Sequence, residues 1–212
     1  KIKSIIAKLD SPDITFADVR ITITDHEYIY FTNGNLRAMG SSLGAHTIGI
    51  RILKDGCFGF AGSDDLSDGS IDRLIKRAKD NATHGAAFQK EKLSFPALSA
   101  TKGEYFFTPE IDPFTMDKEE KLDFFSKLAE SIKPQGKIVY SGVSANFEKQ
   151  EKYYANTEGS YYHSVVYNSD PSMSVAASDG KEMQSRTWPG HMGTGRAGFE
   201  LFHKHEFMKN TE

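Results

Sequence analysis

The chain has 212 residues, of which 26 are lysine or arginine and 29 are aspartate or glutamate, so its formal net charge is -3 at pH 7. A chain of this length can bury about 70% of the surface that it exposes when unfolded, so it is long enough to form a stable hydrophobic core. The balanced charge lacks the basic footprint of a protein that binds a phosphate backbone, and we expect no direct nucleic-acid partner.

The first predicted element is a short amphipathic helix. Ile2, Ile5, Ile6 and Leu9 follow the spacing of one helix face, and Ser11-Pro12 ends the run.

A first antiparallel β-meander follows this helix. Apolar and polar residues alternate around Ile21 and around Ile50, as in half-buried strands, and Asn33-Gly34 and Asp55-Gly56 are strong hairpin signals. The four predicted strands cover residues 19–23, 28–32, 48–52 and 57–61.

Two helices and a long connection come next. Ser70 is the expected N-cap of a helix that ends at His84-Gly85, and Asp117 with Glu120 forms a capping box for a helix that stops before Pro134. Residues 86–114 between these helices show no periodicity, which is long for a connection and is typical of a lid or arm.

The second half of the chain repeats the meander. The segment from Glu27 to Gly56 has a counterpart from Glu151 to Gly180 of the same length, with an aromatic strand and a glycine turn in each. Strands are predicted around residues 143–147, 153–155, 165–167, 173–177 and 183–187.

These elements predict an α+β fold with two related antiparallel β-meanders and helices packed on the sheet. The repeat units cover about 14–85 and 117–190. The pattern leaves open whether the meanders join side by side or face each other. Glu27 and Glu151 each stand before an aromatic strand and a glycine turn, and Glu151 has no histidine near it in sequence, so we interpret both as structural residues that fix strand register.

One histidine cluster resembles a metal motif in part. His203-Lys204-His205-Glu206 contains the first two letters of a zinc-protease helix, which needs a second histidine one turn later, but Lys209 and Asn210 occupy those positions. We therefore interpret the cluster as the solvated face of a terminal helix. We assign no catalytic, cofactor-binding or metal residue in this chain.

Other polar residues give weaker signals. Five histidines stand alone in sequence and are interpreted as surface or turn residues: His26, His46, His84, His163 and His191. The glycine-rich segment 190–198 fits a flexible hinge or close-packed turn better than a phosphate site, because no compact βαβ unit precedes it. No serine lies in a nucleophile-elbow context.

The aromatic residues allow a binding role. Most of them should belong to the sheet core or to cross-strand pairs, and the remainder could line a groove. The candidates are Tyr28, Tyr30, Phe31, Tyr105, Phe106, Phe107, Tyr153, Tyr154, Tyr161, Tyr162 and Tyr167. Since meanders have free edges that can pair with an extended peptide, the architecture favours peptide capture.

An ordered set of motifs resembles the TldD/PmbA proteins, also called modulators of DNA gyrase. The motifs cover nearly the whole chain. They are residues 17–22 through Glu27 and 33–34, 49–56 with 59–62, 112–113 ahead of 118–121, 155–156 with 158–159, and 193–200.

This resemblance implies that the chain is the N-terminal α+β domain, residues 1–212, of a protein about twice as long. In the TldD branch, a C-terminal domain absent from this chain carries His-Glu-x-x-x-His and a later cysteine that bind zinc. The family cuts unfolded or leader-bearing peptides as a metallopeptidase, typically as a TldD/TldE heterodimer. Neither Cys57 nor His205-Glu206 matches those ligands, so the resemblance transfers no catalytic residue, and we expect this chain alone to be inactive and free of zinc.

The leading hypothesis is therefore a substrate-embracing, partner-contacting domain of a TldD-like zinc peptidase. The alternative is a non-catalytic PmbA/TldE subunit or a peptide-binding adaptor, with either a heterodimer or a homodimer partner. The end of the chain after Phe199 has no glycine or proline stop, as expected for a piece of a longer protein. The single cysteine favours a cytoplasmic location, and the lack of any run of about 18 apolar residues predicts no membrane partner.

Overall fold

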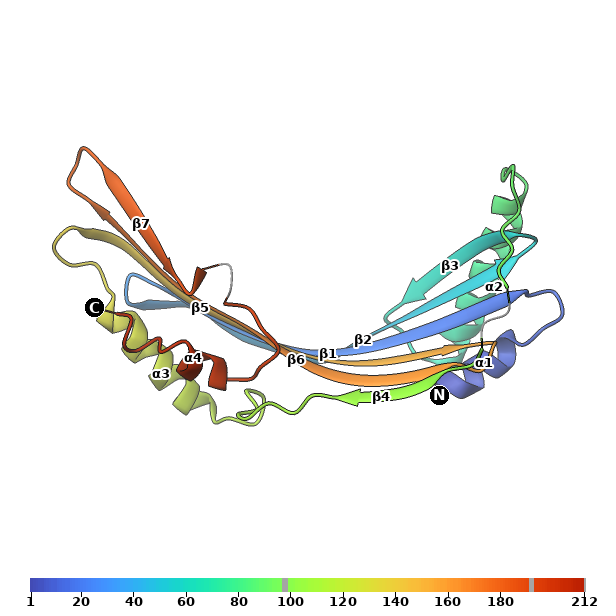
Figure 1. The fold of residues 1–212 in the computed structure, drawn as a ribbon, viewed down its shortest axis with the longest axis horizontal. Coiled ribbons are helices and arrows are strands. Elements are labelled where there is room, and N and C mark those ends of the chain that lie inside the picture. Colours follow the sequence, from blue (N-terminus) through green and yellow to red (C-terminus); the bar gives the residue numbers. More distant parts are fainter. Residues whose placement is uncertain (97–98, 191–192, 212) are drawn as a thin grey trace. The chain divides into compact units, whose positions relative to one another are not determined.

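A computed structural model describes residues 1–96, 99–190 and 193–211. Its helices and strands confirm the predicted α+β class (Figure 1). In chain order the elements are α1 (Ile2–Leu9), β1 (Phe16–Thr32), β2 (Asn35–Lys54), β3 (Cys57–Ser63), α2 (Asp68–Ala86), β4 (Lys102–Phe106), α3 (Lys118–Ser131), β5 (Ile138–Asn156), β6 (Tyr161–Ser178), β7 (Met183–Trp188) and α4 (Glu200–Lys204).

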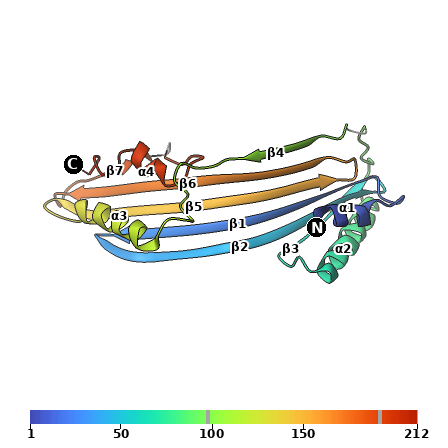
Figure 2. The same cartoon turned by 90° about the horizontal axis from the view of Figure 1, so that it is seen from below.

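The strands form one sheet in the order β3-β2-β1-β5-β6-β4, with β7 also paired to β6. The two meanders, β1–β2–β3 and β5–β6–β7, therefore join side by side through β1 and β5, which resolves the alternative that the sequence left open. β3 pairs antiparallel with β2, and β7 pairs antiparallel with β6. β4 pairs with β6 in parallel, and Figure 2 shows these two strands running alongside each other.

The strands are longer than predicted. The first meander has three strands and not four, because β1 covers both segments that were predicted as separate strands. Val19, Ile21, Ile29 and Phe31 are all buried at odd positions, so the period-two pattern stays in phase through the whole of β1. The turn that ends β1 matches its prediction, since Asn33 and Gly34 both have positive φ (54° and 79°), as a tight hairpin requires.

The predicted helices are confirmed, with corrected ends. The N-cap of α2 is Ser67 and not Ser70, and its hydroxyl accepts a hydrogen bond from the backbone N–H of Ser70. α2 continues past His84-Gly85 to Ala86. Asp117 caps α3 as predicted, because its carboxylate accepts the N–H groups of Glu119 and Glu120.

Two expectations about connecting and terminal segments are wrong. The connection 86–114 contains a strand, β4. Its five residues do not alternate between apolar and polar, so the sequence pattern did not predict it. The terminal helix α4 ends at Lys204, so most of the segment from Phe199 onward is turn. Within the described part of the chain, no helix combines the length and apolar composition that a membrane span needs.

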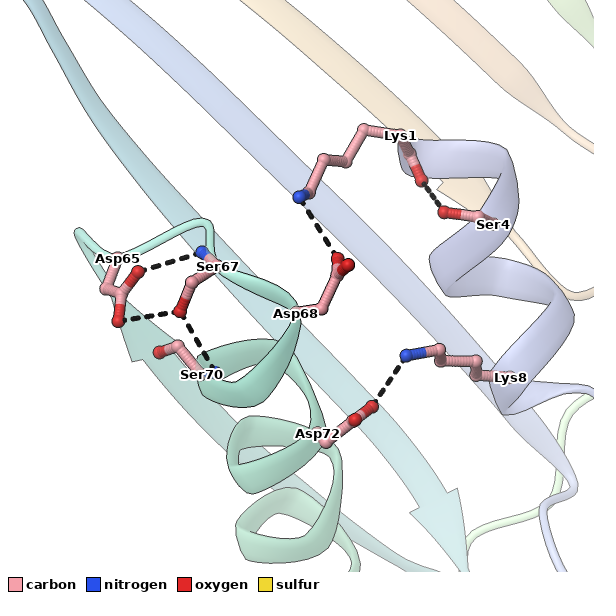
Figure 3. Close-up of polar contacts among 8 residues, drawn as sticks. All are labelled: Lys1, Ser4, Lys8, Asp65, Ser67, Asp68, Ser70 and Asp72. Carbon is pink, nitrogen blue, oxygen red and sulfur yellow. Dashed lines mark hydrogen bonds and ion pairs between the residues drawn. The ribbon is translucent and has the colours of Figure 1, made fainter.

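The chain divides into two compact units, each built from three segments. Unit 1 contains residues 1–24, 44–106 and 150–165. Its core joins α1 and α2 to the sheet through buried residues such as Ile5, Ile50 and Ala78. Figure 3 shows that α1 and α2 are also linked by two ion pairs, Lys1–Asp68 (3.2 Å) and Lys8–Asp72 (2.7 Å).

Unit 2 contains residues 25–43, 107–149 and 166–212. Its core is rich in phenylalanine, and five phenylalanines are almost completely buried: Phe125, Phe147, Phe199, Phe202 and Phe207. Their rings contact one another at centroid distances of 5.0 to 6.0 Å, for example between Phe125 and Phe202. This cluster fastens α3 and α4 to one face of the strands.

Candidate functional site

The candidate functional site in unit 1 is the edge strand β4. It stands at the end of the strand order, so among the described strands only β6 pairs with it. Its side chains are mostly exposed, including Tyr105 (47%) and Phe106 (54%), and Tyr162 on β6 is also exposed (42%). The outer backbone groups of such an edge can pair with an extended chain, and the aromatic side chains can contact its residues.

A polar and aromatic cluster holds β4 against the sheet. The imidazole Nε2 of His163 lies 2.8 Å from Glu151 Oε1, and the phenol of Tyr153 donates to the same oxygen at 2.6 Å. The His163 ring stacks on Tyr153 at 4.2 Å and meets the edge of Phe106 at 4.9 Å. We interpret this cluster as the group that positions β4.

This geometry corrects the sequence interpretation of two residues. His163 is not an isolated histidine, and Glu151 does have a histidine neighbour, because pairing of β5 with β6 brings together residues that are 12 positions apart. The structural role predicted for Glu151 stays compatible with the cluster, since no nucleophile is among its contacts described above.

The cluster makes one prediction about ionisation. The hydrogen bond to Glu151, followed by burial, raises the pKa of Tyr153 from 10 to about 12. A phenol with a raised pKa stabilises the fold at pH values below its unfolded pKa, and this contribution is lost as pH rises from 10 to 12. We expect Glu151→Gln to return the pKa of Tyr153 toward 10, as measured by ultraviolet titration of the phenolate.

The chain has other tyrosines, so Tyr153→Phe is measured as well, and the part of the ultraviolet titration that it removes belongs to Tyr153. Glu148→Gln is the matched control, because Glu148 lies on the same strand and contacts Asn168 instead. An unchanged Tyr153 pKa in Glu151→Gln would contradict the assigned cause.

Unit 1 also contains an apolar pocket of about 490 Å³. Its walls come from the starts of β1 and β3, from β2, from the segment before residue 97 and from the turn between β5 and β6. They are Thr15, Phe16, Arg51, Leu53, Phe58, Phe95, Pro96 and Glu158. The Arg51 guanidinium lies 4.9 Å from the centre of the Phe58 ring and pairs with buried Asp18, so the cation in the wall is neutralised.

The other repeated glutamate has a different partner. In unit 2, Glu27 pairs with the ammonium group of Lys121, which is buried on α3 and also donates to the Pro113 carbonyl at 2.6 Å. This ion pair ties β1 to α3 and to the segment before α3. The structural role predicted for Glu27 is compatible with this ion pair, whose partner sequence reasoning missed.

The partial zinc motif has no metal geometry. His203 and Lys204 end α4 and are exposed, His205 follows the helix, and the Glu206 carboxylate pairs with Lys209. Among the described residues, no group of three histidine, cysteine, aspartate or glutamate side chains lies close enough to hold a metal ion. The described residues thus do not fit a zinc ion.

The remaining sequence candidates are dispersed. His26 lies beside Tyr28 on β1, His46 is exposed on β2, and His84 is in the last turn of α2. His191 lies outside the described residues, as does Met192 of the glycine-rich segment.

The described part of the glycine-rich segment is a close-packed turn. The buried carboxylate of Glu200 accepts the N–H groups of Gly198 (2.9 Å) and Ile111 (3.0 Å). Burial opposes its ionisation, but these backbone donors outweigh burial and keep the pKa of Glu200 below its usual value. Because Glu200 itself uses these donors, they are not available to a bound phosphate.

The predicted aromatic residues divide between core and surface. Phe31 and Tyr167 are buried, whereas Tyr30, Tyr105, Phe106 and Tyr162 are exposed. Of the remaining ones, Tyr28, Tyr153, Tyr154 and Tyr161 are half-buried strand residues, and Phe107 is half-buried just after β4. The sequence predicted that some of these aromatic residues are in the core and others on the surface, and the structure shows which are which.

Two family descriptions match the chain in order. Residues 17–82 match the PmbA/TldA metallopeptidase domain 1, and residues 111–206 match the PmbA/TldA metallopeptidase central domain. A metalloprotease of Methanocaldococcus jannaschii is 23% identical over 185 residues, which cover 87% of this chain and 40% of that protein. The chain thus spans less than half the length of this curated relative.

Solved structures show the same fold. A candidate modulator of a DNA gyrase from Thermotoga maritima has a TM-score of 0.70 and 19% identity, with 92% of this chain and 42% of that chain covered. TldE from Thermococcus kodakarensis has a TM-score of 0.67 and 10% identity, with 97% and 45% covered. Together with the two consecutive family matches, these similarities confirm the resemblance seen in the sequence motifs: the chain belongs to the PmbA/TldD family.

Proposed function

We propose that residues 1–212 form the N-terminal, substrate-embracing and partner-contacting domain of a TldD-like zinc metallopeptidase. The two metallopeptidase family matches support the class of the parent protein. The observation that carries the substrate-binding part is the edge strand β4, which combines an open side in the described sheet with exposed aromatic side chains.

The proposed substrate is an unfolded or leader-bearing peptide in extended conformation. Such a peptide can add to β4 through main-chain hydrogen bonds, which do not depend on sequence, while Tyr105, Phe106 and Tyr162 contact its side chains. The cluster of Glu151, Tyr153 and His163 supports β4 from the sheet side, so the edge is held in place before the peptide arrives.

Zinc belongs to the proposal for the parent protein only. The proposed zinc ligands are the His-Glu-x-x-x-His motif and later cysteine that the resemblance implies for the parent, and residues 1–212 do not contain that motif. We expect no stoichiometric zinc and no peptidase activity from residues 1–212 alone. Elemental analysis that found one tightly bound zinc per chain would overturn this expectation, and absence of His-Glu-x-x-x-His from the complete reading frame would overturn the TldD assignment.

The proposal includes a partner subunit and a location. The partner is a TldD/TldE-type subunit or a second copy of the parent, and the place of action is the cytoplasm, which the single free cysteine, Cys57, supports. The second candidate function is a non-catalytic PmbA/TldE-type subunit or peptide-binding adaptor. The fold shared with TldE over 97% of this chain favours it. Chelator-sensitive cleavage by the full-length protein separates the two, because an adaptor binds peptide without cleaving it.

Peptide binding to the free edge of β4 can be tested with a fluorescent neutral peptide. About eight serine, threonine and glutamine residues are long enough to span β4. Fluorescence anisotropy should detect binding that is lost when alternate peptide nitrogens are methylated, because each lost backbone hydrogen bond weakens binding about fivefold. Tyr105→Lys should also weaken binding, since a charge on an edge strand opposes pairing.

Val139→Lys is the matched control, because Val139 is equally exposed (52%) but lies on β5 in unit 2. Equal affinity for the normal and the methylated peptide would show that the peptide does not add to a strand edge, and the proposed function would fail.

A further inference from the structure

A second surface of interest is the strand face in unit 2 that α3 and α4 do not cover. Side chains at odd positions of β1 and β5, such as Ile29 and Val143, are buried in the phenylalanine core. Even positions therefore face the opposite side. That side carries four aromatic side chains, which we name the aromatic platform: His26, Tyr28, Tyr30 and Tyr140.

Contacts between neighbouring rings show that the platform is continuous along β1. The ring centroids of His26 and Tyr28 are 5.9 Å apart, and those of Tyr28 and Tyr30 are 5.6 Å apart. The Tyr30 hydroxyl donates to Asn146 Oδ1 on β5 at 2.8 Å, which links the row to the next strand. Tyr30 and Tyr140 remain exposed at 37% and 44%.

Two glycines show how tyrosines of the platform lie on the sheet: Tyr28 extends over β2, and Tyr140 extends along its own strand, β5. A Cβ atom on Gly40 of β2 would be 2.7 Å from the Tyr28 hydroxyl oxygen and 2.8 Å from its ring, so the phenol occupies the space above that glycine. A Cβ atom on Gly142 would be 2.9 Å from the Tyr140 hydroxyl oxygen. A ring that lies on the sheet above a glycine can expose its face, and the face of an aromatic ring attracts cations.

Two carboxylates lie beside the platform on β5 and β6. Glu148 on β5 and Asp170 on β6 occupy even positions, on the face of the tyrosines. Among the described residues, no lysine or arginine occupies the even positions of 26–32, 140–148 or 168–172, whereas exposed Arg37 on β2 lies opposite Tyr30 across the Asn33-Gly34 hairpin. Lys149 lies on the other face, over the Tyr167 ring and 4.0 Å from Asp25. The platform therefore combines aromatic side chains with two carboxylates, Glu148 and Asp170, for which the described residues show no ion pair.

We propose that the aromatic platform binds the lysine and arginine side chains of an extended cationic peptide. The peptide lies along the strands, with alternate side chains toward the sheet, so that a residue every second position meets a tyrosine face or one of the two carboxylates. This inference rests on the proposed peptide-binding function and names its substrate class.

The test compares fluorescent peptides of about eight residues in which threonine alternates with lysine, glutamine or glutamate, a spacing that places alternate side chains on one face. The lysine peptide should bind tightest, and salt should weaken it. Tyr28→Leu and Tyr30→Leu should each weaken lysine-peptide binding about two- to fivefold, the effect of one exposed cation–π contact. Tyr28→Phe keeps the ring and should bind normally.

The carboxylates are tested by the double variant Glu148→Gln/Asp170→Asn, which should weaken the lysine peptide and leave the glutamine peptide unchanged. Its control is Glu119→Gln/Asp123→Asn on α3, which removes two acids outside the even positions of the platform strands. Phe60→Leu, an exposed aromatic residue on β3 in unit 1, is the control for loss of a ring. Thermal unfolding by circular dichroism verifies that each variant is folded.

The outcomes separate this inference from the proposed function. If Tyr105→Lys weakens the glutamine peptide but the platform variants bind the lysine peptide like the unmodified protein, the edge proposal stands and the platform inference is overturned. Equal affinity for the lysine and glutamine peptides overturns the inference as well. A third outcome would assign the platform to sugars instead. In that case a neutral oligosaccharide displaces the peptides, Tyr28→Leu and Tyr30→Leu abolish this displacement, and the protein does not bind the lysine peptide more tightly than the glutamine peptide.

Discussion

Lys121→Ala is expected to lower the free energy of unfolding by about 3 to 5 kcal/mol, the cost of breaking a buried ion pair from one side. The Lys121 side chain is 3% exposed and that of Glu27 is 17% exposed. Its removal leaves the Glu27 carboxylate without a counter-charge, the Pro113 carbonyl without its donor and a gap beneath α3. Chemical denaturation followed by circular dichroism measures the effect.

A double variant that removes both charges tests the cause. The double variant Lys121→Met/Glu27→Gln should recover much of the loss, because it removes both charges and keeps the volume of both side chains. Lys127→Ala is the control on the same helix, since Lys127 forms an exposed i,i+4 pair with Asp123 and should change stability by about 0.5 kcal/mol or less. Equal effects of Lys121→Ala and Lys127→Ala would refute the structural role of Glu27.

Gly59→Ala is expected to destabilise unit 1 by about 3 kcal/mol, at the upper end of the range for overpacked cores. α2 packs against β3 at this glycine. An added Cβ would lie 2.0 Å from the Ala78 carbonyl oxygen and 2.4 Å from the Ala82 nitrogen, both of which are backbone atoms. Since neither atom belongs to a movable side chain, the whole helix has to shift away from the strand.

Gly69→Ala provides the comparison, because Gly69 lies in α2 and, among the described residues outside the helix backbone, a Cβ there has only the Arg73 side chain nearby, at 3.6 Å. Alanine should be neutral or stabilise by up to about 1 kcal/mol in that helix. Denaturation curves of the two variants measure both effects. If Gly59→Ala proves as stable as Gly69→Ala, the described contact between α2 and β3 is wrong.

Local patterns in the sequence predicted the elements well where one face is buried. α1, the Asp117 cap of α3 and the Asn33-Gly34 turn follow directly from the spacing of apolar residues and from turn chemistry. The alternation of apolar and polar residues was a weaker signal where the exposure of side chains changes along a strand. β1 was divided in two because residues 22–28 are only half-buried, and the alternation that links Ile21 to Ile29 is faint there.

A weak local pattern also explains why the edge strand β4 was not predicted. β4 has five mostly exposed residues, so neither face carries an apolar signal. Its existence depends on pairing with β6, about 59 positions later in the chain. A partner so distant in sequence leaves no trace in the local pattern of Lys102–Phe106.

The sequence by itself determined the α+β class, the repeated meander, the main turns and, through its ordered motifs, the family, because each of these depends on residues close together in the chain. Only the tertiary structure decided that the meanders join through β1 and β5, that Glu151 meets His163, that Glu27 meets Lys121, and that Tyr28 lies over Gly40. The physical reason is that period-two patterns specify the face of a residue, whereas its neighbours depend on which strands pair and in what register.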